Sequence, residues 1–187
     1  MTGDLHFSHK NIIKFDDRPF ESIEEHDEAL VDYFNESVKP GDIAFLLGDI
    51  CMGHIADSLE FAKRLNGHVY LIPGNHDRVS HVNKEEYQLK FRGMYEKVFK
   101  ILPDNITLAL NGVETNFSHF PYDGDHMEKE RYSEFRMKDR GVNLIHAHTH
   151  SKEKFSLSAK GSKQVNVGVP AWNWRPAHID QVAELFV

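Results

Sequence analysis

Short apolar runs alternate with amphipathic segments through the first half of the chain. Ser22 has a glutamate three residues on, and apolar residues then recur at helical spacing as far as Val38, which predicts a capped helix. Two apolar runs are too short for surface helices and are typical of buried strands. The pattern predicts buried strands over 42–47 and 69–72, and further helices over 55–65 and 84–91.

The second half is rich in strands. Asn111-Gly112 separates two alternating runs, 106–110 and 113–117, and is a strong hairpin signal. Further strands are predicted over 142–145, 154–157 and 164–169, while the charged stretch 123–141 reads as helical or lid-like. Alternating strands and helices followed by strands indicate an α/β layered fold, and no linker divides residues 1–187, so we expect one domain.

Composition narrows the class of protein. Among 187 residues, 22 Lys+Arg oppose 29 Asp+Glu for a net charge of −7, and 40% are hydrophobic, an ordinary globular balance. The longest apolar run, 43–47, is far short of a membrane span, and no basic-then-apolar leader opens the chain, so we expect a cytoplasmic protein without a membrane partner. One cysteine, Cys51, excludes an internal disulfide and a multi-thiolate zinc cluster. Histidine is unusually common, at 13 residues.

Polar side chains follow five of the short apolar segments. The carboxyl ends of strands are where α/β sheets collect ligands, and carboxylate and imidazole suit Zn, Mn, Fe or Ni. These side chains stand in Asp4-Leu5-His6, Gly48-Asp49, Gly74-Asn75-His76-Asp77, Ser118-His119 and His146-Ala147-His148-Thr149-His150.

Two pairs of these residues are spaced two apart. If the backbone is extended, Asp4 and His6 face the same way, and so do His148 and His150. Two such clamps and the two oxygens of Asp49 are enough to hold two cations about 3.5–4 Å apart, the arrangement used for in-line displacement at phosphorus.

The five fragments, in this order over residues 4–150, resemble the calcineurin-like metallophosphoesterase superfamily. The opening residues 4–12 are also similar to a branch of small bacterial and phage phosphoesterases. The resemblance implies a four-layer αββα sandwich, in which two mixed β-sheets are flanked by helices.

The resemblance also implies roles for individual residues. Asp4, His6 and His150 would hold one metal ion, and Asn75, His119 and His148 the other, with Asp49 bridging them. His76 matches the family's catalytic histidine, which is not a ligand, and Asp77 is a candidate to orient it.

The expected function is metal-dependent hydrolysis of a small phosphodiester or phosphomonoester. A hydroxide bridging the two metals would attack phosphorus, and His76 would act as general acid. We expect two divalent cations, Mn²⁺ first, with Fe, Ni, Zn or Co also compatible. His9, Asn11 and Arg18 lie close in sequence to the first clamp and would either reach the substrate phosphate or face solvent.

Some alternatives stay open at this point. Ala147 replaces the family's usual glycine, and His146-Ala147-His148 offers a second register for the last motif. Only three residues precede Asp4, so either the first strand is abbreviated or residues precede it. A nuclease or RNA-end-processing enzyme is less favoured because of the net charge of −7. A non-catalytic binding module on the same fold would have lost ligands that this sequence keeps.

Overall fold

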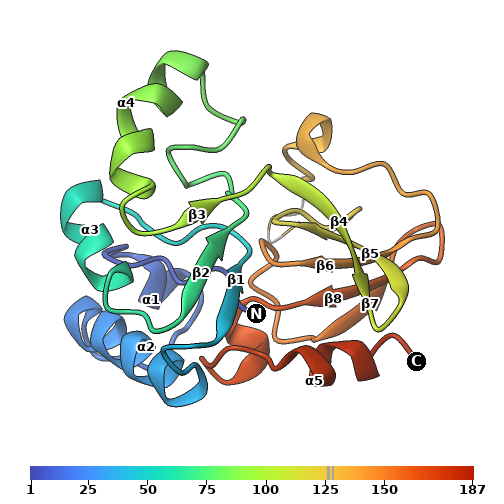
Figure 1. Ribbon diagram of the computed structural model, residues 1–187, viewed down its shortest axis with the longest axis horizontal. Coiled ribbons are helices and arrows are strands. Elements are labelled where there is room, and N and C mark those ends of the chain that lie inside the picture. Colours follow the sequence, from blue (N-terminus) through green and yellow to red (C-terminus); the bar gives the residue numbers. More distant parts are fainter. Residues whose placement is uncertain (126, 128) are drawn as a thin grey trace.

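Two β-sheets form the centre of the molecule, with helices outside them (Figure 1). The computed structural model describes residues 1–125, 127 and 129–187. The first sheet has the order β1-β2-β3 and the second the order β4-β5-β6-β8-β7. The expected α/β sandwich of two sheets flanked by helices is confirmed.

The first sheet is parallel, and the helices on it come from the same half of the chain. Its strands are β1 (Ile43–Leu46), β2 (His68–Leu71) and β3 (Lys100–Ile101), and its helices are α1 (Ile12–Phe15), α2 (Ile23–Ser37), α3 (Ile55–Ala62) and α4 (Glu85–Tyr95). The Ser22 hydroxyl accepts a hydrogen bond from the Glu25 N–H at the start of α2, so the predicted cap is confirmed.

The second sheet mixes parallel and antiparallel pairs. It contains β4 (Asn105–Leu110), β5 (Val113–Ser118), β6 (Asn143–His146), β7 (Phe155–Leu157) and β8 (Lys163–Asn166). The β4–β5 hairpin is confirmed, and Asn111 and Gly112 both have positive φ, as its tight turn requires. The short helix η2 (Val169–Trp172) and helix α5 (Ile179–Glu184) follow, and α5 lies along this sheet (Figure 1).

The charged stretch 123–141 is not a long helix, so that prediction is wrong. One short 3₁₀ helix, η1 (Ser133–Phe135), forms there, while residues 126 and 128 lie outside the described part of the chain. The lid alternative for this stretch stays a prediction. No described helix is both long and apolar enough to cross a membrane.

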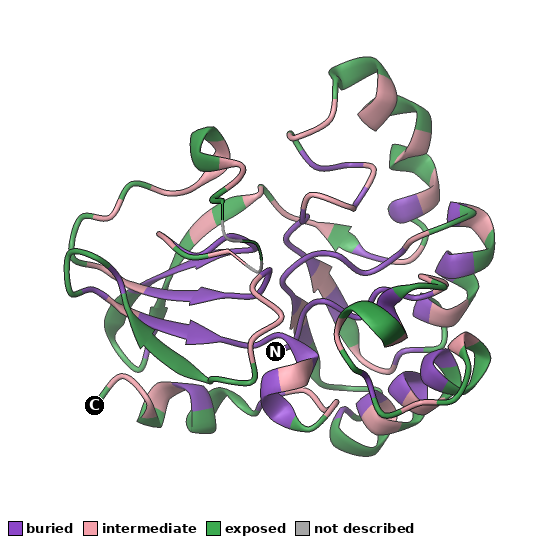
Figure 2. Ribbon diagram, turned by 180° about the vertical axis from the view of Figure 1, so that it is seen from behind, coloured by how far each residue is buried: buried purple, intermediate pink, exposed green. Residues whose placement is uncertain are grey.

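The first residues of the chain run between the two sheets. Thr2 forms a parallel bridge with Leu46 of β1, and Gly3 forms one with Gly168 beyond β8. The described pairings of this segment are isolated bridges and not a strand. Because this segment joins the two sheets, the residues after Gly3 enter the centre of the molecule, where Figure 2 shows mostly buried backbone.

Two apolar clusters stabilise this arrangement. One lies between the first sheet and its helices and includes Phe34, Leu59 and Tyr95; the other includes Phe117 and Val182 and extends to α5. Burial of a large apolar side chain contributes about 1.5–3 kcal/mol. The packed sheets therefore form a rigid support for the polar residues at the strand ends.

Candidate metal centre

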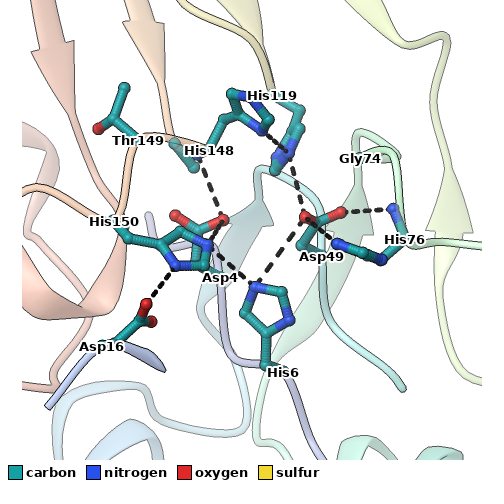
Figure 3. Close-up of polar contacts among 12 residues, drawn as sticks. Asp4, His6, Asp16, Asp49, Gly74, His76, His119, His148, Thr149 and His150 are labelled. Atoms are coloured by element: carbon teal, nitrogen blue, oxygen red, sulfur yellow. Dashed lines mark hydrogen bonds and ion pairs between the residues drawn. The ribbon is translucent and has the colours of Figure 1, made fainter. Parts of the chain in front are cut away.

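The first group of ligand atoms comes from two distant parts of the chain. Asp4, His6 and His150 each direct one ligand atom to a common point, all within 4.8 Å of one another (Figure 3). The Nε2 atoms of His6 and His150 are 3.1 Å apart, and His150 Nε2 lies 3.9 Å from Asp4 Oδ1. Carboxylate and imidazole atoms that converge in this way can hold a divalent cation.

The second group lies beside the first. Asp49, His119 and His148 converge in the same manner, with His119 Nε2 3.3 Å from Asp49 Oδ2 and 3.2 Å from His148 Nδ1. The side-chain oxygen of Asn75 is 3.1 Å from His119 Nε2, so Asn75 joins this group. Asp49 Oδ2 is also 4.0 Å from His6 Nε2, which places this carboxylate between the two groups.

In the last motif, His148 and His150 are the histidines that lie in the two candidate ligand groups. His146, at the end of β6, directs its Nδ1–H to the carbonyl oxygen of Ala147 and belongs to neither group. The geometry therefore favours His148 and His150 over the alternative pair of His146 and His148.

The backbone of the ligand residues differs from the expectation. Asp4, His6, Asp49, His148 and His150 all have φ between 51° and 69°, so the paired residues are not extended. The left-handed region is unfavourable for residues other than glycine, and such strain concentrates at functional sites.

Glycine is required where the loops after β1 and β2 meet. A Cβ on Gly74 would lie 2.4 Å from Asp49 Oδ1 and 2.8 Å from His119 Cε1. This close approach lets the Gly74-Asn75 turn lie directly against the Asp49 carboxylate.

Neighbouring charges and burial set the protonation of the site. Burial alone would raise the pKa of Asp49, but the adjacent His119 lowers that pKa well below its usual range. Burial opposes charge on His119 as well, yet Asp49 raises the pKa of His119 to about 9. Burial lowers the pKa of His148 to about 3 and takes the pKa of His6 well below its usual value. A cation bound here would displace the His119 proton, because a ligating imidazole must be neutral.

The residues present fit divalent cations. Asp4 Oδ2 is buried and has no hydrogen-bond partner in the described part of the chain, although an unpaired buried carboxylate oxygen is costly. Within each group two imidazole nitrogens lie close together: His6 Nε2 is 3.1 Å from His150 Nε2, and His148 Nδ1 is 3.2 Å from His119 Nε2. A cation in each group would supply the missing positive partner.

His76 lies at the edge of the second group. Its side chain is 39% exposed, its Nε2 is 4.0 Å from Asp49 Oδ2, and its backbone N–H donates to Asp49 Oδ1. The ring can therefore reach both the centre and a substrate that approaches from solvent.

Asp77 does not orient the His76 ring, so that expectation is corrected. Its buried carboxylate accepts hydrogen bonds from the backbone N–H groups of Asp49, Ile50 and Gly74. Asp77 thus holds the loops after β1 and β2 together, because its two oxygens satisfy three buried amide donors.

The three expected substrate contacts separate in the structure. The expectation that Arg18 contacts the substrate or faces solvent is wrong. Its guanidinium is buried and donates to Asp16 and to the carbonyl oxygens of Asp4 and Leu5. His9 is half-buried, with its ring centroid 5.3 Å from that of His6. Asn11 is exposed at the start of α1.

Two carboxylates at the site escaped the sequence reasoning. Asp16 Oδ1 lies 2.8 Å from Nδ1 of His150, and Asp125 Oδ2 lies 3.2 Å from Nε2 of His148. Asp16 follows a four-residue helix and Asp125 lies in the charged stretch, so neither follows a strand. Asp16 lies 134 residues from His150 and Asp125 lies 23 residues from His148, and no motif in the sequence links the members of either pair.

The chain is similar in sequence to a known protein family and to proteins from phages and an archaeon. A sequence model described as calcineurin-like phosphoesterase matches residues 1–152. The Gene 66 protein of Mycobacterium phage L5 is 32% identical over 195 residues, covering 99% of this chain and 92% of the phage protein. An uncharacterized protein of Methanocaldococcus jannaschii is 27% identical, covering 99% of this chain and 89% of its own length.

A solved structure shows the same fold. The crystal structure of a protein of unknown function from Aquifex aeolicus superposes with a TM-score of 0.69 at 22% identity, covering 98% of this chain and 96% of that one.

Proposed function

The chain belongs to the calcineurin-like phosphoesterase family, and from this premise we propose that it hydrolyses small phosphodiesters or phosphomonoesters with two divalent cations. The observation that carries the proposal is the pair of ligand groups with Asp49 between them. The oxygen and imidazole ligands suit Mn²⁺ first, and Fe, Ni, Zn or Co as well. When bound, two such cations supply charge neutralisation at the phosphoryl oxygens and activation of water.

The protein residues have distinct tasks in this proposal. Asp4, His6 and His150 would hold one cation, and Asn75, His119 and His148 the other, with Asp49 shared. His76 would hold a proton at Nε2 and pass it to the departing oxygen of the ester. The contact of its backbone N–H with Asp49 keeps His76 at the rim of the centre.

The surroundings of His150 favour a small ester over a nucleic acid. A hollow of about 750 Å³ adjoins His150 and is lined by Phe15, Asp16, Asp17 and Met127, among others, and no Lys or Arg is among its described lining residues. Phosphate polymers are bound mainly through Lys and Arg. Phe15, at 71% exposure, instead offers an apolar surface to the organic group of a small ester.

The direct test is hydrolysis of bis-p-nitrophenyl phosphate and p-nitrophenyl phosphate with Mn²⁺, with and without EDTA. We expect release of p-nitrophenol that stops with EDTA and returns with excess Mn²⁺. If neither ester is cleaved while Mn²⁺ binds, the non-catalytic binding module is correct. Cleavage of single-stranded RNA in preference to both esters, with a steep loss at higher salt, would instead support the nuclease.

A further inference from the structure

Arg18 is a buried arginine whose hydrogen-bonding capacity is fully used. A guanidinium carries five N–H donors, and each has an acceptor here. Nε and Nη2 both bond to Asp16 Oδ2, at 3.2 and 3.0 Å; Nη2 also donates to the Asp4 carbonyl at 3.0 Å. Nη1 bonds to the Leu5 carbonyl at 3.2 Å and to His26 Nε2 at 2.8 Å. Such a group is fixed in position rather than free to meet a ligand.

The acceptors of Arg18 are parts of one cation site. The carbonyl groups of Asp4 and Leu5 belong to the segment that carries Asp4 and His6, where both ligand residues have positive φ. Two hydrogen bonds from a rigid, planar guanidinium hold this unfavourable backbone in place.

Asp16 connects Arg18 with the third ligand of the same site. Its Oδ2 accepts from Arg18, and its Oδ1 lies 2.8 Å from Nδ1 of His150, 134 residues away in the sequence. With Nδ1–H donating to this carboxylate, the Nε2 lone pair of His150 points to Asp4 and His6. A carboxylate partner of this kind fixes the tautomer and orientation of a ligating histidine.

The network continues into helix α2. His26 and Asp27 are 2.7 Å apart through Nδ1 and Oδ1, and Asp27 Oδ2 accepts from the backbone N–H of Ser8. Arg18 also lies over the ring of Trp174, 5.4 Å from its centroid. Helix α2 thereby anchors both Arg18 and the end of the strained segment that begins at Asp4.

We propose that Asp16 and Arg18 are positioning residues for the cation site of Asp4, His6 and His150. Arg18 holds the backbone of the first two ligands, and Asp16 holds the imidazole of the third. This inference rests on the cation-binding part of the proposed function and not on hydrolysis. It assigns to the ion pair of Asp16 and buried Arg18 the task of joining ligands from opposite ends of the sequence.

The second cation site has a comparable carboxylate from another part of the chain. Asp125 is bonded to Arg131 at 3.0 Å and to His148 at 3.2 Å. The two carboxylates act on different histidines, so a variant of each should affect a different site.

The test is calorimetric titration of the metal-free chain with Mn²⁺. The wild type is expected to bind two ions. Asp16→Ala should weaken one site about 10–100-fold and leave the other within about twofold, since loss of such a partner typically has this effect. Asp125→Ala should weaken the other site by a similar factor. Asp32→Asn, which removes an exposed carboxylate on helix α2 that belongs to neither ligand group, serves as the charge control and should leave both affinities unchanged.

Combined variants separate orientation from general loss of structure. In a His150→Ala background, Asp16→Ala should cause a smaller loss than in the wild type, because the imidazole that Asp16 holds is gone and only its hydrogen bonds with Arg18 remain. Asp16→Asn keeps an acceptor oxygen for His150 Nδ1–H and should restore part of the affinity. Thermal unfolding in EDTA, followed by circular dichroism, shows whether each variant is folded at the titration temperature.

Several outcomes would overturn the proposal: wild-type affinities at both sites of Asp16→Ala, equal losses at both sites, or losses that simply add in the double variant with His150→Ala. A wild type that binds fewer than two ions would also overturn it. Two bound ions without hydrolysis would refute the proposed function alone.

Discussion

The two halves of the candidate metal centre are built differently. Asp4, His6 and His150 depend on side chains, because Arg18 and Asp16 hold both the segment that carries the first two residues and the ring of the third.

The half around Asp49 and His119 depends more on backbone groups. His119 Nδ1 lies 2.8 Å from the carbonyl oxygen of Leu47, and Asp77 accepts from backbone N–H groups in the loops that carry Asp49 and Asn75. These loops follow parallel strands, so sheet pairing already brings them to one edge. In the half formed by Asp4, His6 and His150, the hydrogen bonds of buried Arg18 take the place of this strand pairing.

The largest expected effect comes from the residue between the halves. Asp49→Asn should weaken Mn²⁺ binding at both sites by more than about 100-fold. The effect should exceed that of Asp16→Ala because Asp49 would bind the cations itself, whereas Asp16 contacts only a ligating histidine. Calorimetric titration measures both sites at once. Loss at a single site would show that Asp49 serves only one half.

His76 tests whether the chemistry can be separated from cation binding. His76→Ala should lower turnover of bis-p-nitrophenyl phosphate by about 10²–10⁴-fold, the usual contribution of a general acid, and leave the Mn²⁺ stoichiometry at two. A near wild-type rate would remove His76 from the reaction. His68→Ala, which removes an exposed histidine at the start of β2 that belongs to neither ligand group, is the matched control.

Removal of cations should show that both halves contribute to stability. An ion present at 100 times its Kd stabilises the folded chain by about 2.7 kcal/mol, which raises Tm by about 5–10 °C per site in a protein of this size. Differential scanning calorimetry with and without EDTA measures this shift. In Asp16→Ala, cations should raise Tm only by the amount that one site contributes. A rise in Tm equal to that of the wild type would contradict the division between the halves.

The smallest effect is expected at the rim of the first half. His9 is half-buried beside His6 but belongs to neither ligand group. His9→Ala should raise KM several-fold with kcat nearly unchanged, as when a contact contributes equally to substrate and transition state. Steady-state kinetics with both nitrophenyl esters would detect a fall in kcat, which would instead place His9 in the reaction.

Local patterns were sufficient for most of the fold. The Ser22 cap, the Asn111-Gly112 hairpin and the buried strands depend on a few adjacent residues, and each forms where it was predicted. The helical alternative for 123–141 was wrong because the charges there resemble those of a solvated helix, whereas Asp125 bonds to Arg131 and Arg136.

The order and spacing of Asp, Asn and His after short strands determined, from the sequence alone, the family resemblance and the residues that could bind metal. Only the tertiary structure decided that His148 and His150 lie in the two candidate ligand groups, that the candidate ligands adopt left-handed backbone, and that Arg18 is internal. The physical reason is distance along the chain. Asp16 and His150 meet across 134 residues, and a contact of that kind exists only after both sheets and the segment between them have packed.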